Sequence, residues 1–251
     1  MCSVKCDKKV AVISGGASGI GRSTAERFSR EGIIPVIVDL NREAAEKLAA
    51  ELNGMAVVTD VTNYDECKLT AQKIYNEYGR IDILVPCAGG SSARILNQPG
   101  RFHEAPISRI EFGLKLNLMG AIYMAHSIIQ YMVKAKYGKI VFIGSVAGVV
   151  GAVGGAEYSA SKGGLESLTK SLAMELGIYG INVNIVSPGP INTREAMKNG
   201  NTFLGRIGEP EEVANVIYFL CSDEASFVTG HNYIVDGGRS LGGLPWGKSN
   251  R

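Results

Sequence analysis

Long runs of Lys or Arg are absent from this sequence, and charges of the two signs nearly balance. The 251 residues hold 26 basic and 24 acidic side chains, a formal net charge of +2. Proteins that bind nucleic acids through a basic surface carry a clear excess of positive charge on one face or segment. We therefore expect no nucleic-acid partner.

Cysteine and histidine are also sparse. The five cysteines are an odd number, are scattered and form no C-x-x-C pair, and there are only three histidines. This pattern gives neither a disulfide framework nor a metal site, so we expect no metal. It fits a reducing compartment, and we expect a cytoplasmic protein. The cysteines are Cys2, Cys6, Cys67, Cys87 and Cys221.

Membrane signals are missing too. The N-terminus MCSVKCDKK has no apolar signal core, and no apolar run approaches the roughly 18 residues of a membrane span. The length and 45% hydrophobic content suffice for one core, with no internal repeat or linker. We expect one domain over residues 1–251, with an N-terminal extension at 1–8 and a C-terminal tail at 239–251. That tail holds the single tryptophan, and one hypothesis is that it reaches a neighbouring subunit.

Short apolar runs alternate with segments of helical periodicity along most of the chain. This β-α alternation predicts an α/β fold in which a parallel sheet is doubly wound, with helices on both faces. After a first run that begins near Lys9, the expected strands are Ile33–Val38, Met55–Thr59, Ile81–Val85, Lys139–Ile143, Ile181–Ser187 and Asn232–Val235.

A glycine-rich turn follows the first expected strand. Gly15, Gly19 and Gly21 form a G-x-x-x-G-x-G pattern before a helix. Glycines at such a turn allow the backbone to approach a pyrophosphate at the helix N-terminus. A plain strand-to-helix turn would explain the same glycines, but the position after the first strand favours a dinucleotide site.

Asp39 ends the second expected strand, eighteen residues after Gly21. A carboxylate there can accept both hydroxyls of an adenosine ribose and repels a 2'-phosphate, which predicts NAD rather than NADP. Two alternatives remain open: Asp39 is the N-cap of a helix from Arg42 to Leu52, or Arg42 holds a phosphate.

Small residues from Cys87 to Gly90 follow the fourth expected strand, and a long irregular segment, Ser91 to Pro106, comes next. Ligands of open α/β sheets lie at this edge, so we interpret the segment as a wall of the substrate site. Arg94 and Arg101 either recognise an anionic substrate or are simply solvated. His103 has no evident acidic partner and is interpreted as a surface residue.

Asn117 stands in the apolar stripe of a helix expected from about Ile107 to Lys134. A buried asparagine can satisfy a backbone group without any further role. Further along, Arg194 to Gly205 is short and polar and is interpreted as a mobile lid, and Glu209 to Glu212 has the proline and acids of a helix start.

Tyr158 and Lys162 are four residues apart and share one face of an expected helix. Ser145 precedes the tyrosine by thirteen residues, at the end of a strand. A tyrosine has a reference pKa near 10, and a nearby cation favours the phenolate. Tyr64 and Lys68 have the same spacing without such a serine, so the spacing alone has little meaning.

Together these motifs resemble the short-chain dehydrogenase/reductase superfamily over about Lys9 to Gly238. The matching segments are SGGASGIG, Asp60, CAG at 87–89, Asn117, Ser145, YSASK at 158–162, PGPINT and SFVTGHNYIVDGG. The resemblance implies a single-domain Rossmann-like fold and hydride transfer between a nicotinamide and a carbonyl or alcohol carbon.

The resemblance also implies the residue roles. Tyr158 would be the general acid/base, Ser145 would polarise the substrate oxygen, Lys162 would lower the tyrosine pKa and hold the nicotinamide ribose, and Asn117 would hold a relay water. The implied cofactor contacts are Gly15, Ser18, Gly19, Ile20, Gly21, Asp39, Leu40, Asp60, Val61, Ala88, Gly89, Tyr158, Lys162, Pro188, Ile191 and Thr193.

One departure from the family pattern is the segment Pro86-Cys87, where the family has two asparagines that brace the central strand. The segment before the Asn117 helix also looks longer, and the lid shorter, than in compact members. We expect an NAD-dependent dehydrogenase for a secondary alcohol on a polyol, sugar, hydroxy acid or sterol, assembled as a homotetramer or dimer. The alternatives are a 3-oxoacyl-thioester reductase and a non-catalytic NAD-sensing module.

Overall fold

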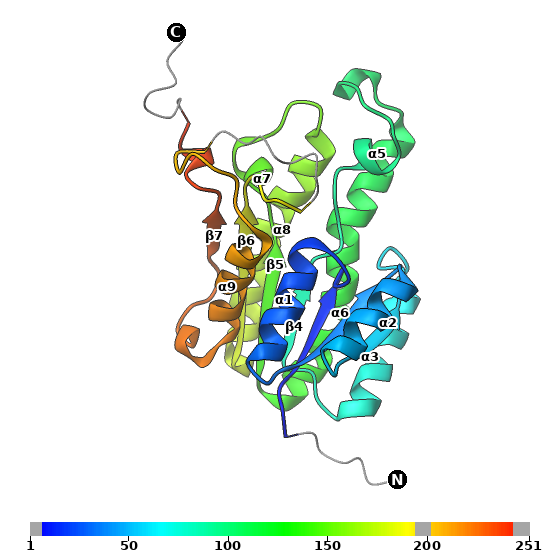
Figure 1. Cartoon of the computed structure of the whole chain (residues 1–251), viewed down its shortest axis with the longest axis vertical. Helices are drawn as coiled ribbons and strands as arrows, with labels where there is room; N and C mark the ends of the chain where they lie inside the picture. Colours follow the sequence, from blue (N-terminus) through cyan, green and yellow to red (C-terminus); the bar gives the residue numbers. More distant parts are fainter. Residues whose placement is uncertain (1–6, 194–201, 243–251) are drawn as a thin grey trace.

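The structure, a computed structural model, describes residues 7–193 and 202–242. The first six residues, most of the predicted lid and the tail with Trp246 lie outside the described residues. The described parts form a seven-stranded sheet flanked by helices (Figure 1).

All neighbouring strands in the sheet pair in parallel, in the order β3-β2-β1-β4-β5-β6-β7. The predicted α/β doubly wound fold is confirmed. The strands are β1 Val10–Ser14, β2 Ile34–Asp39, β3 Met55–Val58, β4 Ile83–Pro86, β5 Gly138–Ile143, β6 Ile181–Pro188 and β7 Asn232–Val235.

Strand β1 lies at the point where the direction of strand progression reverses. Val12 pairs with Val36 of β2 on one side and with Leu84 of β4 on the other. Chain connections leave β1 and β4 in opposite directions, so a crevice opens at the carboxyl ends of these two strands. In Figure 1 these ends point upward.

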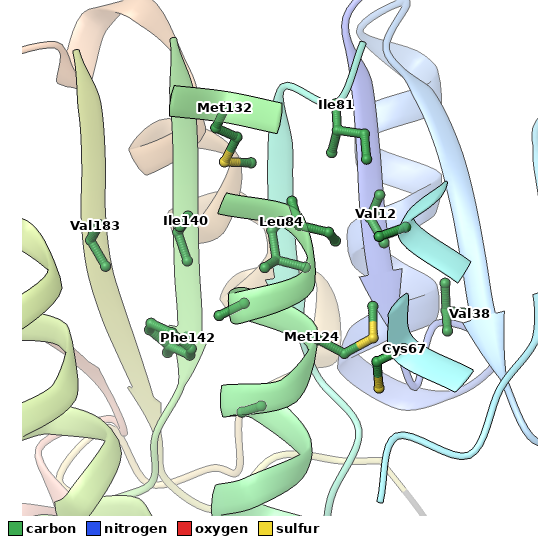
Figure 2. Packing of buried hydrophobic residues seen from close by; sticks show 14 of the residues in the cluster. Val12, Val38, Cys67, Ile81, Leu84, Met124, Met132, Ile140, Phe142 and Val183 are labelled. Atoms are coloured by element: carbon green, nitrogen blue, oxygen red, sulfur yellow. The ribbon is translucent and has the colours of Figure 1, made fainter. Parts of the chain in front are cut away.

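Helices cover both faces because the central strands are apolar on both sides. Helices α1 (Gly19–Arg30), α2 (Arg42–Glu51) and α9 (Pro210–Cys221) pack on one face. On the other face lie α3 (Tyr64–Tyr78), α6 (Gly120–Ala135) and α8 (Ala156–Leu176). Figure 2 shows Met124 and Met132 of α6 in the same core cluster as Leu84 and Ile140 of the sheet.

The ends of these helices are set by local hydrogen bonds. Asn41 is the N-cap of α2 and accepts a hydrogen bond from the Ala44 N–H at 3.1 Å. The alternative in which Asp39 is the N-cap is therefore wrong, since the cap lies two residues later. The predicted start of α9 is confirmed: Glu209 is its N-cap and donates its N–H to Glu212 Oε2.

The segment from Ser91 to Pro106 is less irregular than expected. It contains the short helix α4 (Ser92–Ile95) and a 3₁₀ turn at Phe102–Glu104. Ser91 caps α4 by accepting from the Arg94 N–H at 3.4 Å. The other short elements are helix α7 (Val146–Val150) and 3₁₀ turns at Gly177–Tyr179, Asp223–Ala225 and Arg239–Leu241.

Helix α5 (Ile107–Leu114), a π-helical turn (Lys115–Met119) and α6 form one continuous helix. Among the described residues, this one helix is long and apolar enough by length and composition to cross a membrane, although charged and polar residues such as Lys115 and His126 keep any continuous apolar run in it well short of 18 residues. Its Met124, Ile128 and Met132 are fully buried against the sheet, as in the core helix of a globular protein.

Candidate active site

A cleft of about 540 Å³ opens at the carboxyl edge of the sheet, above β1, β4, β5 and β6. Thirteen of the residues expected to bind cofactor or substrate line it. They are Gly15, Ser18, Gly19, Ile20, Gly21, Ala88, Gly89, Ser145, Tyr158, Lys162, Pro188, Ile191 and Thr193. Residues as far apart in the sequence as Gly15 and Thr193 meet here because parallel strands place their carboxyl ends at one edge.

The glycine turn leaves the N-terminus of α1 open to an anion. Ser18 is the N-cap, but its side chain makes no capping hydrogen bond, and the first turn contains no acidic residue. The first N–H groups of a helix have no partner within it and carry partial positive charge. This end of the cleft therefore suits a pyrophosphate.

Close backbone packing explains two of these glycines. Gly15 has φ +63°, and a Cβ atom on it would lie 2.7 Å from the Ala88 nitrogen. A Cβ on Gly21 would lie 2.2 Å from the Gly15 oxygen. Only glycine allows the turn to pass this close to β4 and to itself.

Four of the expected cofactor contacts lie outside the cleft lining, at the ends of β2 and β3. Asp39 accepts hydrogen bonds from Ala17 N–H at 3.1 Å and Asn41 N–H at 3.0 Å, which fixes its carboxylate beside the glycine turn. Leu40 is 66% exposed and Val61 is buried. Asp60 accepts from the Thr62 N–H at 2.9 Å. Their contacts with an adenosine stay a prediction.

Asn117 lies behind the cleft wall and braces it. Its side chain accepts from the Gly90 N–H at 2.8 Å and donates to the carbonyl oxygens of Gly90 at 2.9 Å and Gly113 at 3.0 Å. The residue is buried and sits in the π-helical turn, a kind of irregularity that often marks functional sites. The side chain thus satisfies backbone groups, and a water relay stays a prediction.

Lys162 is buried at the floor of the cleft. Its Nζ donates to the Ile143 carbonyl at 2.8 Å and lies 5.6 Å from the centroid of the Tyr158 ring. Burial lowers the pKa of Lys162 from 10.5 to about 8. An ammonium held this close to the ring favours the charged form of the phenol.

Ser145 and Tyr158 reach the same cleft from different elements. Ser145 follows β5 and caps α7, where its Oγ accepts from the Ala147 N–H at 3.1 Å. Because Oγ acts as an acceptor in that bond, its own hydrogen is available to donate into the cleft. Tyr158 lies in the first turn of α8, one turn before Lys162.

The departure at Pro86-Cys87 is compensated by other residues. Ser14 O accepts from the Cys87 N–H at 2.9 Å, and Ser14 Oγ accepts from the Ala88 N–H at 3.4 Å. Asn117 holds the following Gly90. The strand end is therefore braced by Ser14 and Asn117 in place of the asparagines.

Two features of the wall formed by residues 91–106 differ from expectation. Only Ser91 and Arg94 of this segment line the cleft, while Arg101 does not. Sequence reasoning missed the pair Arg109 and Glu157, which lies behind the segment, and no local signal pointed to it. The other lining residues that were not predicted as contacts are Cys87, Gly90, Ile143, Gly144 and Gly189.

The remaining candidates lie away from the cleft. Tyr64 and Lys68 lie on α3, where the tyrosine faces α6, with its hydroxyl 2.8 Å from His126 Nδ1, and the exposed lysine pairs with Asp65. His103 is exposed beside Glu104, as predicted for a surface residue. Within residues 7–193 and 202–242, no group of three or more metal-ligating side chains comes together.

The chain is similar in sequence to known proteins. A family model described as enoyl-(acyl carrier protein) reductase matches residues 15–240. The chain is 37% identical to 3-oxoacyl-[acyl-carrier-protein] reductase FabG of Thermotoga maritima, over 94% of this chain and 99% of that one. It is 35% identical to the 7alpha-hydroxysteroid dehydrogenase of Bacteroides fragilis, over 94% and 95%.

A solved structure agrees in fold. The structure of a short-chain type dehydrogenase/reductase from Mycobacterium ulcerans superposes with a TM-score of 0.89 at 30% identity, covering 96% of this chain and 93% of that one. Sequence and structure match over nearly the full length of each relative. The chain therefore belongs to the short-chain dehydrogenase/reductase family, whose members are oxidoreductases that use nicotinamide cofactors.

Proposed function

We propose that this protein transfers hydride between NAD(H) and a secondary alcohol or ketone of a small or medium-sized metabolite. One observation carries the proposal. Ser145, Tyr158 and Lys162 line one cleft, at whose other end the glycine turn and the uncapped N-terminus of α1 are suited to a dinucleotide.

The proton moves through Tyr158. In the oxidation direction its phenolate oxygen takes the hydroxyl proton of the alcohol, and in reduction its phenol returns that proton to the carbonyl oxygen. Lys162, whose Nζ lies 5.6 Å from the centroid of the Tyr158 ring, stabilises the phenolate. The Ser145 hydroxyl donates to the substrate oxygen and so opposes the charge that develops on it.

A bound nicotinamide supplies the hydride acceptor or donor. Pro188, Ile191 and Thr193 form the wall that would hold its carboxamide, and Lys162 would hold its ribose. Support for this fit comes from the cradle itself: the backbone of Gly15 passes so close to Ala88 that no side chain fits between them. Asn117 keeps Gly90 in place beside this cradle and, in our proposal, relays the proton through water.

The direct test measures reduced nicotinamide by absorbance with a panel of secondary alcohols and with NAD and NADP in parallel. Tyr158→Phe removes the proton carrier, and we expect turnover to fall by about 10³-fold while the NADH affinity stays within a factor of two. Tyr64→Phe is the matched control, because it alters the surface Tyr-Lys pair. Undiminished turnover in Tyr158→Phe would refute the mechanism.

The preference for NAD rests on Asp39. Its carboxylate is fixed by two backbone N–H groups beside the glycine turn, where a 2'-phosphate would meet a negative charge. We expect Asp39→Ser to narrow the ratio of kcat/KM for NAD over NADP by at least tenfold. Arg42→Met should leave the ratio unchanged, since Arg42 is engaged with Glu46.

The second candidate is reduction of a 3-oxoacyl thioester on a carrier protein. The 37% identity to the Thermotoga maritima reductase favours it, whereas Asp39 opposes the NADPH that we would expect such an enzyme to use. An acyl-carrier-protein thioester reduced with NADPH at a higher kcat/KM than any free alcohol or ketone would establish this alternative. Binding of NAD with no turnover on either panel would favour a non-catalytic sensor.

We further propose a homotetramer or dimer in the cytoplasm. Support comes from apolar residues left exposed on the helices around the site, such as Ile107 of α5 at 68% and Met174 of α8 at 77%. The described cysteines, Cys67, Cys87 and Cys221, are free thiols, which suits a reducing compartment. A monomer mass by light scattering would contradict the assembly.

A further inference from the structure

Arg94 lies at the cleft on the short helix α4. It lines the cleft together with Ser145 and Tyr158. Its guanidinium rests on the backbone of Gly90, since a Cβ atom there would be 3.1 Å from Nη2. Asn117 holds Gly90 through hydrogen bonds to both its N–H and its carbonyl oxygen. The surface beneath the guanidinium is therefore fixed.

The charged side chains described in the cleft lining are all positive. Among its described lining residues, Arg94 and Lys162 are cationic and none is acidic. Lys162 is buried and engaged with Ile143 O, so Arg94 supplies the accessible positive charge of this lining. Any anion that enters the cleft is attracted by both groups.

Arg94 also differs from most arginines of the molecule in its partners. Its side chain makes no ion pair or hydrogen bond with the residues described. Most other described arginines are paired with a carboxylate. These are Arg22, Arg27, Arg30, Arg42, Arg80, Arg109 and Arg206.

A buried network fixes the backbone that carries Arg94. Ser92 Oγ donates to Glu157 Oε1 at 2.5 Å, and Arg109 Nη1 donates to the Gln98 carbonyl at 2.8 Å. Glu157 immediately precedes Tyr158 on α8. The start of α4 is thus tied to the helix that bears the tyrosine, and the chain that follows α4 is tied to Arg109 of α5, so the backbone of Arg94 is held at a set position relative to Tyr158. Such preorganisation lowers the entropy cost of binding.

We propose that Arg94 binds a carboxylate of the substrate and makes the enzyme selective for hydroxy and oxo acids. This inference rests on the proposed dehydrogenase function. A guanidinium can pair with a carboxylate through two parallel hydrogen bonds, which also orients the acid so that its carbinol carbon faces Tyr158. One guanidinium matches one carboxylate charge, whereas a phosphate group carries nearly two charges and calls for more donors.

The experiment compares matched substrates on the full-length enzyme with NAD. Four- to six-carbon 2- and 3-hydroxy acids are measured against their methyl esters and against hydroxyalkyl phosphates of equal length. We expect lower KM for the acids, and Arg94→Met should raise that KM about ten- to a hundredfold while changing the esters less than threefold. Arg94→Lys should recover part of the loss, because it keeps the charge without the fork.

Arg101→Met is the control, since it removes a cation from the same segment outside the cleft. The KM of every substrate should be the same in Arg101→Met as in the wild type. The Kd of NADH should also be the same in wild type and Arg94→Met; an increased Kd would mean that Arg94 binds the cofactor phosphates and would overturn the proposal. Two further results would overturn the proposal. One is a lower KM of the wild type for esters or phosphates than for acids. The other is an equal rise in KM for acids and esters in Arg94→Met.

A binding measurement separates this proposal from the proposed function. Calorimetric titration of the enzyme–NADH complex with 2- and 3-oxo acids does not require turnover. Arg94-dependent binding without any hydride transfer would support the carboxylate site and refute the dehydrogenase function. Turnover of neutral alcohols with no Arg94-dependent binding of any acid would support the dehydrogenase function and refute the carboxylate site.

Discussion

Nε of Arg109 lies 3.8 Å from Oε1 of Glu157, and the two side chains are only 0% and 2% exposed. Three atoms of the pair, Arg109 Nε and Nη2 and Glu157 Oε2, have no hydrogen-bond partner among the described residues. A buried pair of this kind is strongly destabilised when one partner loses its charge, because the other is left uncompensated.

We therefore expect Glu157→Gln to lower the free energy of unfolding by about 3–5 kcal/mol, measured by urea denaturation at pH 7. The double variant Arg109→Met/Glu157→Leu should be closer to wild type than the single variant, since it removes both charges. Glu46→Gln, in the exposed pair with Arg42, should cost less than about 1 kcal/mol. A double variant less stable than Glu157→Gln would contradict this account.

Asn117→Ala should make the cleft wall at Gly90 less stable. The substitution leaves the Gly90 N–H and the carbonyls of Gly90 and Gly113 without the side chain that now pairs with them. We expect a loss of about 3 kcal/mol in stability, and faster amide hydrogen exchange at Gly90. Asn41→Ala, which removes only an exposed helix cap, should cost about 1 kcal/mol and leave Gly90 exchange unchanged. Unaltered exchange at Gly90 in Asn117→Ala would argue against the brace.

The variants Gly15→Ala and Gly32→Ala distinguish the effect of backbone strain from the effect of close packing against the Ala88 backbone. Both glycines have positive φ, +63° and +75°, but a Cβ at Gly15 would lie 2.7 Å from Ala88 N, while a Cβ at Gly32 has no atom within 4 Å. Strain should cost each variant about 1–2 kcal/mol in stability, and Gly15→Ala should lose more than Gly32→Ala because its Cβ would also collide with the Ala88 backbone. Only Gly15→Ala should weaken NADH binding, by at least tenfold in a fluorescence titration. Equal affinities in the two variants would mean that the turn does not hold the cofactor.

The sequence was sufficient for the fold because parallel strands buried on both faces appear as continuous apolar runs, such as Val10–Ser14 and Lys139–Ile143. Helix ends that depend on one side chain were less predictable: Asn41, and not Asp39, caps α2. The segment from 91 to 106 was expected to be irregular, and the start of its helix α4 is held by Glu157, which lies 65 positions further along the chain than Ser92.

The candidate site, like the fold, could be predicted only in part from the sequence. Tyr158 and Lys162 could be distinguished from Tyr64 and Lys68 only by their surroundings, and the structure places the first pair in the cleft and the second on α3, away from the cleft, with Tyr64 against α6. Arg109 and Glu157 could not be paired from sequence, because 48 positions separate them and either would pass as a solvated helix residue. Burial of charge is a property of the tertiary packing.

The last prediction concerns Lys162 and pH. Burial lowers its pKa from 10.5 to about 8, and Cys87 gives it no charged partner there because burial raises the pKa of that thiol to about 12. Between pH 8 and 10.5 the unfolded chain holds a proton on Lys162 that the folded chain has lost, so rising pH favours folding. The penalty, about 3 kcal/mol, is complete below pH 8 and disappears as the pH approaches 10.5.

Lys162→Met removes this penalty, so the variant's stability advantage over wild type should be greatest at pH 7.5 and should shrink steadily at pH 8.5 and 9.5. Urea midpoints of both proteins at the three pH values give the difference directly, and the titrations of Lys139 and of the other cysteines cancel because both proteins contain them. Lys68→Met, at an exposed site, is the control, and the change with pH for Lys162→Met is compared with the change that this variant shows. A constant difference for Lys162→Met would mean that the lysine remains charged in the folded protein, and its place beneath Tyr158 would then be that of a permanent cation.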